Sequence, residues 1–334
     1  MMSTSDKICN DSASKSNDVG VCEVVGTQNM STTDDVNKNE VLLDICANCG
    51  KGCSSEMNIC NRCKMVKYCN ATCKKKHRSK HKKKCDRRVA ELHDEALFKQ
   101  PPPHYKDCPI CFQRMPTLDS GSKYKSCCGK VICSGCIHAV RIRDGGVGLC
   151  PFCRTPIPDS DEDVIQRLNK RMEAGDAEAF SCMGFYYANG IRGLPQDHSK
   201  AIELYYKAGE LCHAAAYCSI GQSYKFGRGV RIDDKKAKHF YEVAAMQGDA
   251  MARNNLGCME EEAGNLERAK KHWMIALRDG YAISLEAIQK LHSIGGATKE
   301  EYTQALRSYQ EYFGEIKSSQ RDEAAAAHEE YKYY

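Results

Sequence analysis

Two ladders of closely spaced cysteines carry the chemistry that this sequence could perform. The first lies within about forty residues, and its candidate ligands are Cys46, Cys49, Cys60, Cys63, Cys69, Cys73, His81 and Cys85. Eight such ligands divide into two tetrahedral sites of four, as structural zinc requires. A segment this short buries too little apolar surface to fold alone, so bound metal would supply much of its folding free energy.

The second ladder consists of four cysteine pairs, which again total eight thiols. The pairs are Cys108 with Cys111, Cys127 with Cys128, Cys133 with Cys136, and Cys150 with Cys153. Adjacent cysteines point to opposite sides of an extended strand, so Cys127 and Cys128 reach one metal only through a turn, which Gly129 can provide. His138, two residues after Cys136, is the alternative ligand.

The distribution of cysteine favours zinc over disulfides. Of the 22 cysteines, 16 lie between Cys46 and Cys153, and the N-terminus has no basic start followed by an apolar core. The sequence therefore predicts a reducing compartment, cytoplasmic or nuclear, in which dense Cys-x-x-Cys pairs bind metal. Sixteen ligands predict about four zinc ions. No run of about 18 apolar residues occurs, so we expect no membrane partner.

The elements that must position these ligands follow from composition along the chain. Residues 1–45 lack Phe, Trp and Tyr and predict a disordered arm. The first ladder occupies 46–85, a linker with the sequence QPPPH at its end occupies 86–104, and the second ladder lies within 105–158. Helical periodicity then extends over 163–313, and 314–334 is expected to be a polar tail. The fold class predicted is small zinc-stabilised α+β fingers followed by an all-α solenoid.

The helical part contains an internal repeat. Gly184, Gly221 and Gly257 are separated by 37 and 36 residues, and each unit is predicted to form two helices joined by a turn. The tripeptide Gly-Asp-Ala occurs at 175–177 and again at 248–250, where glycine ends one helix and aspartate caps the next. Such helix pairs stack into a solenoid, which we expect to fold without zinc and to be separable from the cysteine ladders.

The first ladder resembles the MYND zinc finger, because Cys-x3-Cys-x7-His-x3-Cys closes it and KYC precedes that helix. The resemblance implies one zinc on Cys46, Cys49, Cys69 and Cys73 and a second on Cys60, Cys63, His81 and Cys85. It leaves Cys53 and His77 as bystanders. Fingers of this family bind short peptides, and no methyltransferase signature follows.

The second ladder resembles a RING domain of the all-cysteine variety over residues 105–158. Lys130 falls where many RINGs carry a histidine, but an ammonium group has no lone pair for a metal. The cross-brace of this family implies one zinc on Cys108, Cys111, Cys133 and Cys136, and one on Cys127, Cys128, Cys150 and Cys153. If His138 is a ligand instead of Cys127, this assignment changes.

Three further residues match positions at which RING ligases contact a ubiquitin-conjugating enzyme. Ile110 and Pro151 lie inside CPIC and CPFC, and Arg154 matches the cationic residue that hydrogen-bonds both the enzyme and its thioester-linked ubiquitin. The resemblance implies that the domain holds the charged enzyme ready for attack by a substrate lysine, which is a proximity effect without a catalytic residue. Alternatively, Arg154 is an ordinary surface charge and Ile110 is a packing residue.

The repeats resemble Sel1-like repeats, which imply a docking surface for a protein or peptide substrate. The sequence therefore predicts a RING-type ubiquitin-protein ligase whose MYND finger and repeats recruit the target. The alternative is a non-enzymatic scaffold with a degenerate RING. Residues 74–88 hold ten Lys or Arg, but no aromatic residues lie nearby for stacking on bases, so nucleic acid is not an expected partner.

Overall fold

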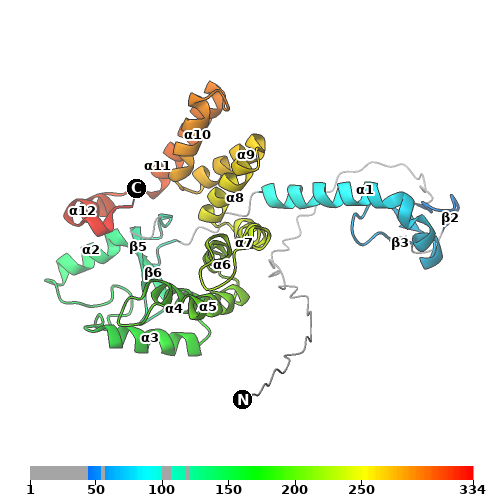
Figure 1. The fold of residues 1–334 in the computed structure, drawn as a ribbon. Helices are drawn as coiled ribbons and strands as arrows, with labels where there is room; N and C mark the ends of the chain where they lie inside the picture. The colour runs from blue at the N-terminus through cyan, green and yellow to red at the C-terminus, as the bar shows by residue number, and fades with distance from the viewer. Residues whose placement is uncertain (1–43, 54–56, 100–106, 118–120, 334) are drawn as a thin grey trace, which may run out of the picture. The chain divides into compact units, whose positions relative to one another are not determined.

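The structure of the chain is a computed structural model that describes residues 44–53, 57–99, 107–117 and 121–333. Residues 1–43 of the predicted disordered arm and the QPPPH sequence at 100–104 lie outside the described residues. Within them, cysteine-rich segments with short strands precede a series of paired helices (Figure 1). The predicted fold class, small α+β fingers followed by an all-α solenoid, is confirmed.

The described strands form three antiparallel hairpins in the two cysteine ladders. The pairs are β1 (Asp44–Ile45) with β2 (Gly52–Cys53), β3 (Asn58–Ile59) with β4 (Lys67–Tyr68), and β5 (Ser122–Lys125) with β6 (Lys130–Cys133). A two-stranded hairpin of this length is not stable by itself in water. Cysteine side chains form most of the buried interior of the first module and half of that of the second, so the stability of both modules depends on what the cysteines bind.

Helix α1 (Ala71–Phe98) follows β4 and is longer than the first ladder requires. Its N-cap is Asn70, whose side chain accepts a hydrogen bond of 2.9 Å from the N–H of Cys73. Residues 86–98, expected as part of a linker, continue this helix. Most are good helix formers, and Arg88 pairs with Glu91 at 3.2 Å and with Glu95 at 2.7 Å along one face.

The second ladder contributes one helix, and the repeats contribute the next nine described helices. In chain order they are α2 (Ser134–Arg143), then α3 (Asp161–Glu173), α4 (Ala177–Asn189), α5 (His198–Glu210), α6 (Ala214–Phe226), α7 (Asp234–Met246), α8 (Ala250–Glu262), α9 (Leu266–Arg278), α10 (Ile283–Ser293) and α11 (Lys299–Ile316). Helices α4 and α5, α6 and α7, and α8 and α9 pack as pairs (Figure 1).

Small residues let the paired helices approach closely at the same place in each repeat. A Cβ atom at Gly184 would lie 2.7 Å from Tyr205, one at Gly221 would lie 2.6 Å from Tyr241, and one at Gly257 would lie 2.3 Å from the indole of Trp273. Trp273 is fully buried, so it belongs to the core of the repeats. The repeated glycines are therefore contact points between helices.

The two Gly-Asp-Ala sequences form the predicted helix boundaries. Gly175 and Gly248 have φ of +74° and +91°, which only glycine adopts freely. Asp176 then accepts a hydrogen bond from the N–H of Glu178, and Asp249 accepts one from the N–H of Ala252. The helix boundaries before α4 and α8 thus use the same two residues, whereas Cys212, with φ of +63°, and His213 stand at the boundary before α6.

The C-terminal residues differ from the predicted polar tail. They contain α12 (Ser319–Ala327) and a 3₁₀ turn, η2 (Glu329–Tyr331), and α12 packs against α2 (Figure 1). Arg321 and Ala324 are fully buried, and Ala324 and Tyr331 belong to the same apolar cluster as the cysteines of the second ladder. Small side chains such as that of Ala324 allow this close packing.

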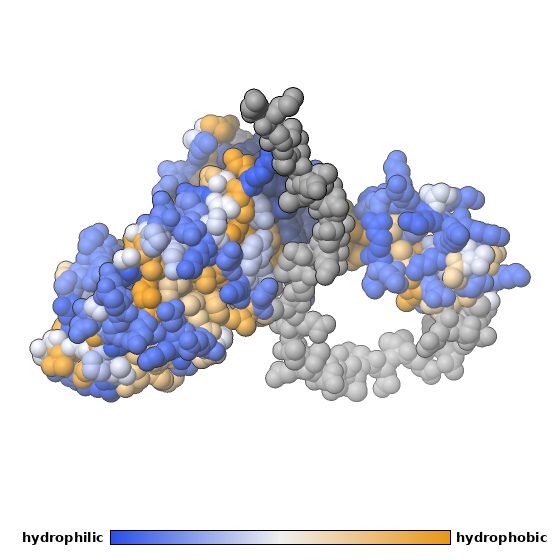
Figure 2. Space-filling view, turned by 60° about the horizontal axis from the view of Figure 1, so that its bottom comes forward, coloured by the Kyte–Doolittle hydropathy of each residue, from blue (hydrophilic) through white to orange (hydrophobic). Residues whose placement is uncertain are grey.

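Hydrophilic residues cover most of the visible surface of the first cysteine module, which stands to the right in Figure 2. This agrees with the Lys-rich sequence of α1 between residues 74 and 88. Among the described residues, no helix combines the length and the apolar character that a membrane span needs.

Candidate metal centres

Four clusters of ligand atoms form in the described part of the chain. In each cluster the four Sγ or ring nitrogen atoms lie within 4.8 Å of one another. The clusters are Cys46, Cys49, Cys69 and Cys73; Cys60, Cys63, His81 and Cys85; Cys108, Cys111, Cys133 and Cys136; and Cys127, Cys128, Cys150 and Cys153. That these sixteen residues bind zinc stays a prediction.

The distances within the clusters fit a tetrahedral zinc ion. Zn–S bonds of about 2.3 Å place two sulfur ligands about 3.8 Å apart, whereas a disulfide would place them at about 2.05 Å. The sulfur–sulfur distance is 3.8 Å for Cys49 and Cys69, for Cys60 and Cys85, for Cys108 and Cys136, and for Cys111 and Cys133. The spacing is therefore that of thiolates around a metal, so the four clusters are compatible with about four zinc ions.

A shared turn positions the Cys-x-x-Cys pairs that open these clusters. Gly50, Lys64, Phe112 and Arg154 each follow the second cysteine of a pair, and each has φ between 55° and 72°. Their N–H groups donate to the carbonyl of the first cysteine at 2.9 Å. Three of the four are not glycine, so the backbone holds a conformation that costs of order 1 kcal/mol or more at each position.

Helix α1 contributes three of the candidate ligands of the first ladder from one face, and Cys69 precedes the helix. Cys73, His81 and Cys85 are its buried residues, apart from Leu97 at its far end. The Nε2 atom of His81 lies 3.2 Å from Sγ of Cys63. His77 lies outside both clusters, with its Nδ1 atom 3.2 Å from the hydroxyl of Tyr68. Cys53 also lies outside them, in β2.

The cysteine pairs of the second ladder are interleaved, with the first and third pairs in one cluster and the second and fourth in the other. Between Cys127 and β6 the chain turns at Gly129, whose φ is +68°. This turn brings both adjacent cysteines to one cluster, with Sγ distances of 3.9 Å from Cys128 to Cys150 and 3.4 Å from Cys127 to Cys153.

Two residues near the second ladder lie outside the clusters: His138, the alternative ligand, and Lys130, which stands where many RINGs carry a histidine. His138 is buried in α2 and faces the rings of His328 and Tyr331, each at 6.2 Å between centroids. Lys130 is exposed, with its Nζ atom 5.9 Å from the centre of the Phe152 ring. Neither belongs to a cluster of ligand atoms.

Hydrogen bonds lower the pKa of some cluster thiols, which favours the thiolate that a metal needs, whereas burial and neighbouring thiols raise the pKa of others, such as Cys85. The backbone N–H of Cys69 lowers the pKa of Cys46 to about 6. The side chain of Cys133, followed by backbone N–H groups of the Cys108 turn, lowers the pKa of Cys108 to about 4. The turns therefore supply donors to sulfur as well as positioning it.

The three residues matched to a conjugating-enzyme surface differ in exposure. Ile110 is half-buried and packs against the cysteine cluster of the module, and Pro151 is also half-buried. Arg154 is exposed and forms an ion pair with Asp144 at the end of α2. This guanidinium, together with that of Arg143, holds the pKa of the Asp144 carboxyl below its ordinary value.

Sequence reasoning missed Asp144 and a set of exposed apolar side chains in the second module. Phe112 is 78% exposed, Ile142 is 64% exposed and Phe152 is 46% exposed. Phe112 and Phe152 adjoin or lie within the Cys-x-x-Cys turns, so their sequence positions were a usable signal. Exposed aromatic residues of this kind are typical of interaction surfaces.

Models of two known protein families match two parts of the chain. The MYND finger family model matches residues 46–85, and the Sel1 repeat model matches residues 183–211 and 214–249. Among solved structures, a Sel1 repeat protein from Oxalobacter formigenes is similar, with a TM-score of 0.41 and 24% identity; the match covers 58% of this chain and 72% of that chain.

Two curated relatives come from Arabidopsis thaliana. One is the ERAD-associated E3 ubiquitin-protein ligase component HRD3B, 30% identical over 115 residues, which are 34% of this chain and 18% of that protein. The other is the component HRD3A, 33% identical over 121 residues, which are 35% of this chain and 17% of that protein. The chain thus spans less than a fifth of the length of either relative.

Together, the matches and the ligand geometry describe the chain at the level of its modules. It carries a MYND finger and Sel1 repeats, both of which suggest a protein-interaction role, and it has four ligand clusters compatible with about four zinc ions.

Proposed function

We propose that this chain is a zinc-dependent RING-type ubiquitin-protein ligase. In this proposal residues 105–158 recruit a ubiquitin-conjugating enzyme, and the MYND finger and the helical repeats recruit the protein substrate. The observation that carries the proposal is the interleaving of the four cysteine pairs, with pairs one and three in one cluster and pairs two and four in the other. This is the cross-brace arrangement that RING resemblance implies.

The surroundings of the clusters support the same proposal. Phe112 and Phe152 expose apolar surface beside Ile110 and Pro151 in the Cys-x-x-Cys turns. Arg154 holds five N–H donors on an exposed guanidinium, which suits bridging two acceptors on a charged enzyme. Its ion pair with Asp144 lies at the protein surface, where such pairs are weak, so a stronger acceptor can replace it.

The Arabidopsis relatives support a place in ubiquitin transfer, since both are named components of an E3 ubiquitin-protein ligase. A second candidate function is a scaffold that joins partners without transferring ubiquitin. It is favoured by the pairing of Arg154 with Asp144, because a purely structural arginine would be held in this way.

Auto-ubiquitination with a panel of conjugating enzymes separates the two functions. A ligase transfers ubiquitin to itself with at least one enzyme of the panel, and Ile110→Ala abolishes the transfer while zinc content stays unchanged. A matched variant, Ile142→Ala, removes an apolar side chain of the same size from α2 and tests whether that exposed residue also contributes. Absence of transfer from fully metal-loaded protein across the panel would favour the scaffold.

A further inference from the structure

The end of α1 is held by the repeats at a defined place. Leu97 is fully buried, and its carbonyl accepts a hydrogen bond from the guanidinium of Arg253 in α8. The ring of Phe98 lies 4.7 Å from that of His272 in α9. The last carbonyls of a helix have no partner within it, so Arg253 satisfies a group that α1 leaves open.

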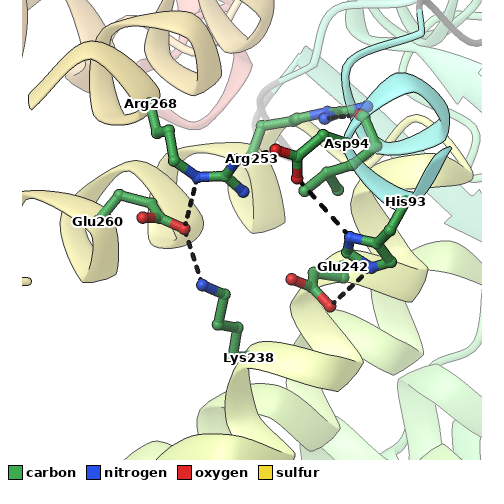
Figure 3. Close-up of polar contacts among 8 residues, drawn as sticks. His93, Asp94, Lys238, Glu242, Arg253, Glu260 and Arg268 are labelled. Atoms are coloured by element: carbon green, nitrogen blue, oxygen red, sulfur yellow. Dashed lines mark hydrogen bonds and ion pairs between the residues drawn. The ribbon is translucent and has the colours of Figure 1, made fainter. Parts of the chain in front are cut away.

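Ion pairs that involve α1 and helices α7, α8 and α9 lie beside this contact (Figure 3). Arg268 lies 2.5 Å from a carboxylate oxygen of Asp94 in α1 and 3.2 Å from Glu260. Glu260 also lies 2.7 Å from Lys238, and His93 of α1 lies 3.4 Å from Glu242. The repeats thus recognise an acidic residue one turn before a buried leucine.

The contact leaves buried polar groups of the repeats without partners. Arg253 is 1% exposed, and its Nε and Nη2 atoms have no hydrogen-bond partner among the described residues. His272 is fully buried, and neither ring nitrogen has a partner in the same part of the chain. An unpaired buried donor costs about 1 to 3 kcal/mol, so the end of α1 satisfies this surface only in part.

A cavity adjoins the same place and is open to a longer ligand. It has a volume of about 470 Å³, Phe98 forms one wall, and the others combine apolar, cationic and acidic side chains: Met274, Ile275, Ile288, Lys270, Lys271, Glu267 and Glu301, with Gln304. Lys270 forms ion pairs with Glu267 and with Glu301, each at 2.8 Å. The part of the lining that is complementary to an acidic and apolar segment such as Asp94, Leu97 and Phe98 is therefore Lys271, whose Nζ atom lies 5.6 Å from the centre of the Phe98 ring, together with the apolar side chains.

We propose that the face formed by α7, α8 and α9 is a docking site for a short segment of a partner protein, and that the end of α1 occupies it in cis. The partner segment would carry an acidic residue followed, one turn later, by two large apolar residues. Release of α1 would open the site and free the finger at the other end of the helix. Docking requires no ubiquitin transfer, so it is independent of ligase activity.

Competition with a peptide tests the proposal on the full, zinc-loaded chain. The probe is a fluorescent peptide of residues 87–99, and binding is measured by anisotropy. The peptide cannot bind while α1 of the same chain occupies the site. The apparent affinity for the peptide is therefore the intrinsic affinity multiplied by the fraction of molecules in which the site is open. Asp94→Arg in the chain repels Arg268 and should tighten peptide binding about tenfold relative to wild type. The matched control, Glu91→Arg, makes the same charge change at a residue whose ion pairs within the described residues are with Arg87 and Arg88 of its own helix, and should leave affinity at the wild-type value.

Two further variants, one of the chain and one of the peptide, test the same docking site. Leu97→Ala in the chain is a second way to open the site, because it removes a side chain of α1 and leaves the repeats unaltered. A peptide that carries Leu97→Asp should not bind any of the proteins. The proposal is wrong if neither Asp94→Arg nor Leu97→Ala tightens binding, or if the Leu97→Asp peptide binds as well as the parent peptide.

Discussion

At the scale of single residues, side chains of the same chemical type lie inside or outside a ligand cluster according to where the backbone places them. Cys127 and Cys128 both reach one cluster because Gly129 turns the chain, whereas His138 faces the aromatic rings of His328 and Tyr331. His77 lies one helical turn from His81 but pairs with Tyr68. Residue type therefore defines the candidates, and backbone geometry selects among them.

Zinc content should distinguish the residues inside the clusters from those outside. We expect about four zinc ions per wild-type chain, and Cys128→Ser should lower the content to about three because the remaining thiols cannot close a tetrahedron. Lys130→Ala, two residues away, should leave it unchanged. Elemental analysis of purified protein measures both. Loss of zinc in His138→Ala together with full retention in Cys127→Ser would overturn the ligand assignment.

His272 should make stability depend on pH. Burial, reinforced by the charges of Arg253 and Arg268, lowers its pKa to about 3. The unfolded chain binds a proton there below about pH 6.5 and the folded chain does not until about pH 3, so stability falls as pH falls through this window, by about 1.4 kcal/mol per pH unit.

Replacing this histidine should flatten that dependence. Chemical denaturation at several pH values should show a smaller slope for His272→Leu than for wild type between about pH 6 and pH 4. His239→Leu, at an exposed position in α7, is the control and should keep the wild-type slope. Equal slopes for all three proteins would mean that His272 is already protonated in the folded chain.

At the scale of elements, the repeated glycines fix how the helices of a pair approach. Gly221→Val should lower the free energy of unfolding by about 1 to 3 kcal/mol, because the new side chain overlaps Tyr241. Gly314→Ala, in α11, meets nothing within 4 Å and should stabilise the chain by about 0.5 to 1 kcal/mol. Thermal or denaturant unfolding measures both. A Gly221→Val protein as stable as wild type would contradict the contact.

The regular elements were the most predictable part of the fold. Period and small residues predicted the helix pairs, and Gly175 with Asp176 predicted a boundary correctly, because these signals are local. The positive φ of Lys64, Phe112 and Arg154 was not predictable from residue type, since the cysteine turns impose it. The extension of α1 to Phe98 was missed because the charged residues of 86–98 were assigned to a linker, although most are good helix formers, and because the helices that bury Leu97 are far away in sequence.

At the scale of the whole molecule, contacts join modules that the sequence presents as separable. The hydroxyl of Tyr124, in β5, donates to Asp176 at the start of α4 at 2.8 Å, and a Cβ atom at Gly129 would collide with Arg171 of α3. Helix α12 packs against α2 from the opposite end of the chain. We therefore no longer expect the repeats to fold as they do here without the second ladder. Nothing local in an alanine-rich C-terminus indicates such a partner.

The C-terminal contact can be broken with one charge. Ala324→Asp places a carboxylate in the apolar cluster shared with the cysteines and should cost about 2 to 4 kcal/mol in stability. It should also speed the release of zinc to a chelator. Ala326→Asp, on the exposed side of the same helix, should change stability by no more than about 0.5 kcal/mol. Identical zinc-release rates for the two variants would show that α12 does not support the second ladder.

The proposed function depends on whether the second ladder acts on a conjugating enzyme that carries thioester-linked ubiquitin. The direct measurement is single-turnover discharge of ubiquitin from such an enzyme to free lysine, with protein whose zinc content is complete. We expect the wild-type chain to accelerate discharge. We expect Arg154→Ala to slow it while binding of the enzyme and zinc content are retained, because the arginine acts on the reactive conformer. Discharge by Arg154→Ala at the wild-type rate, or no acceleration by the wild-type chain with any enzyme of a broad panel, would contradict the proposed function.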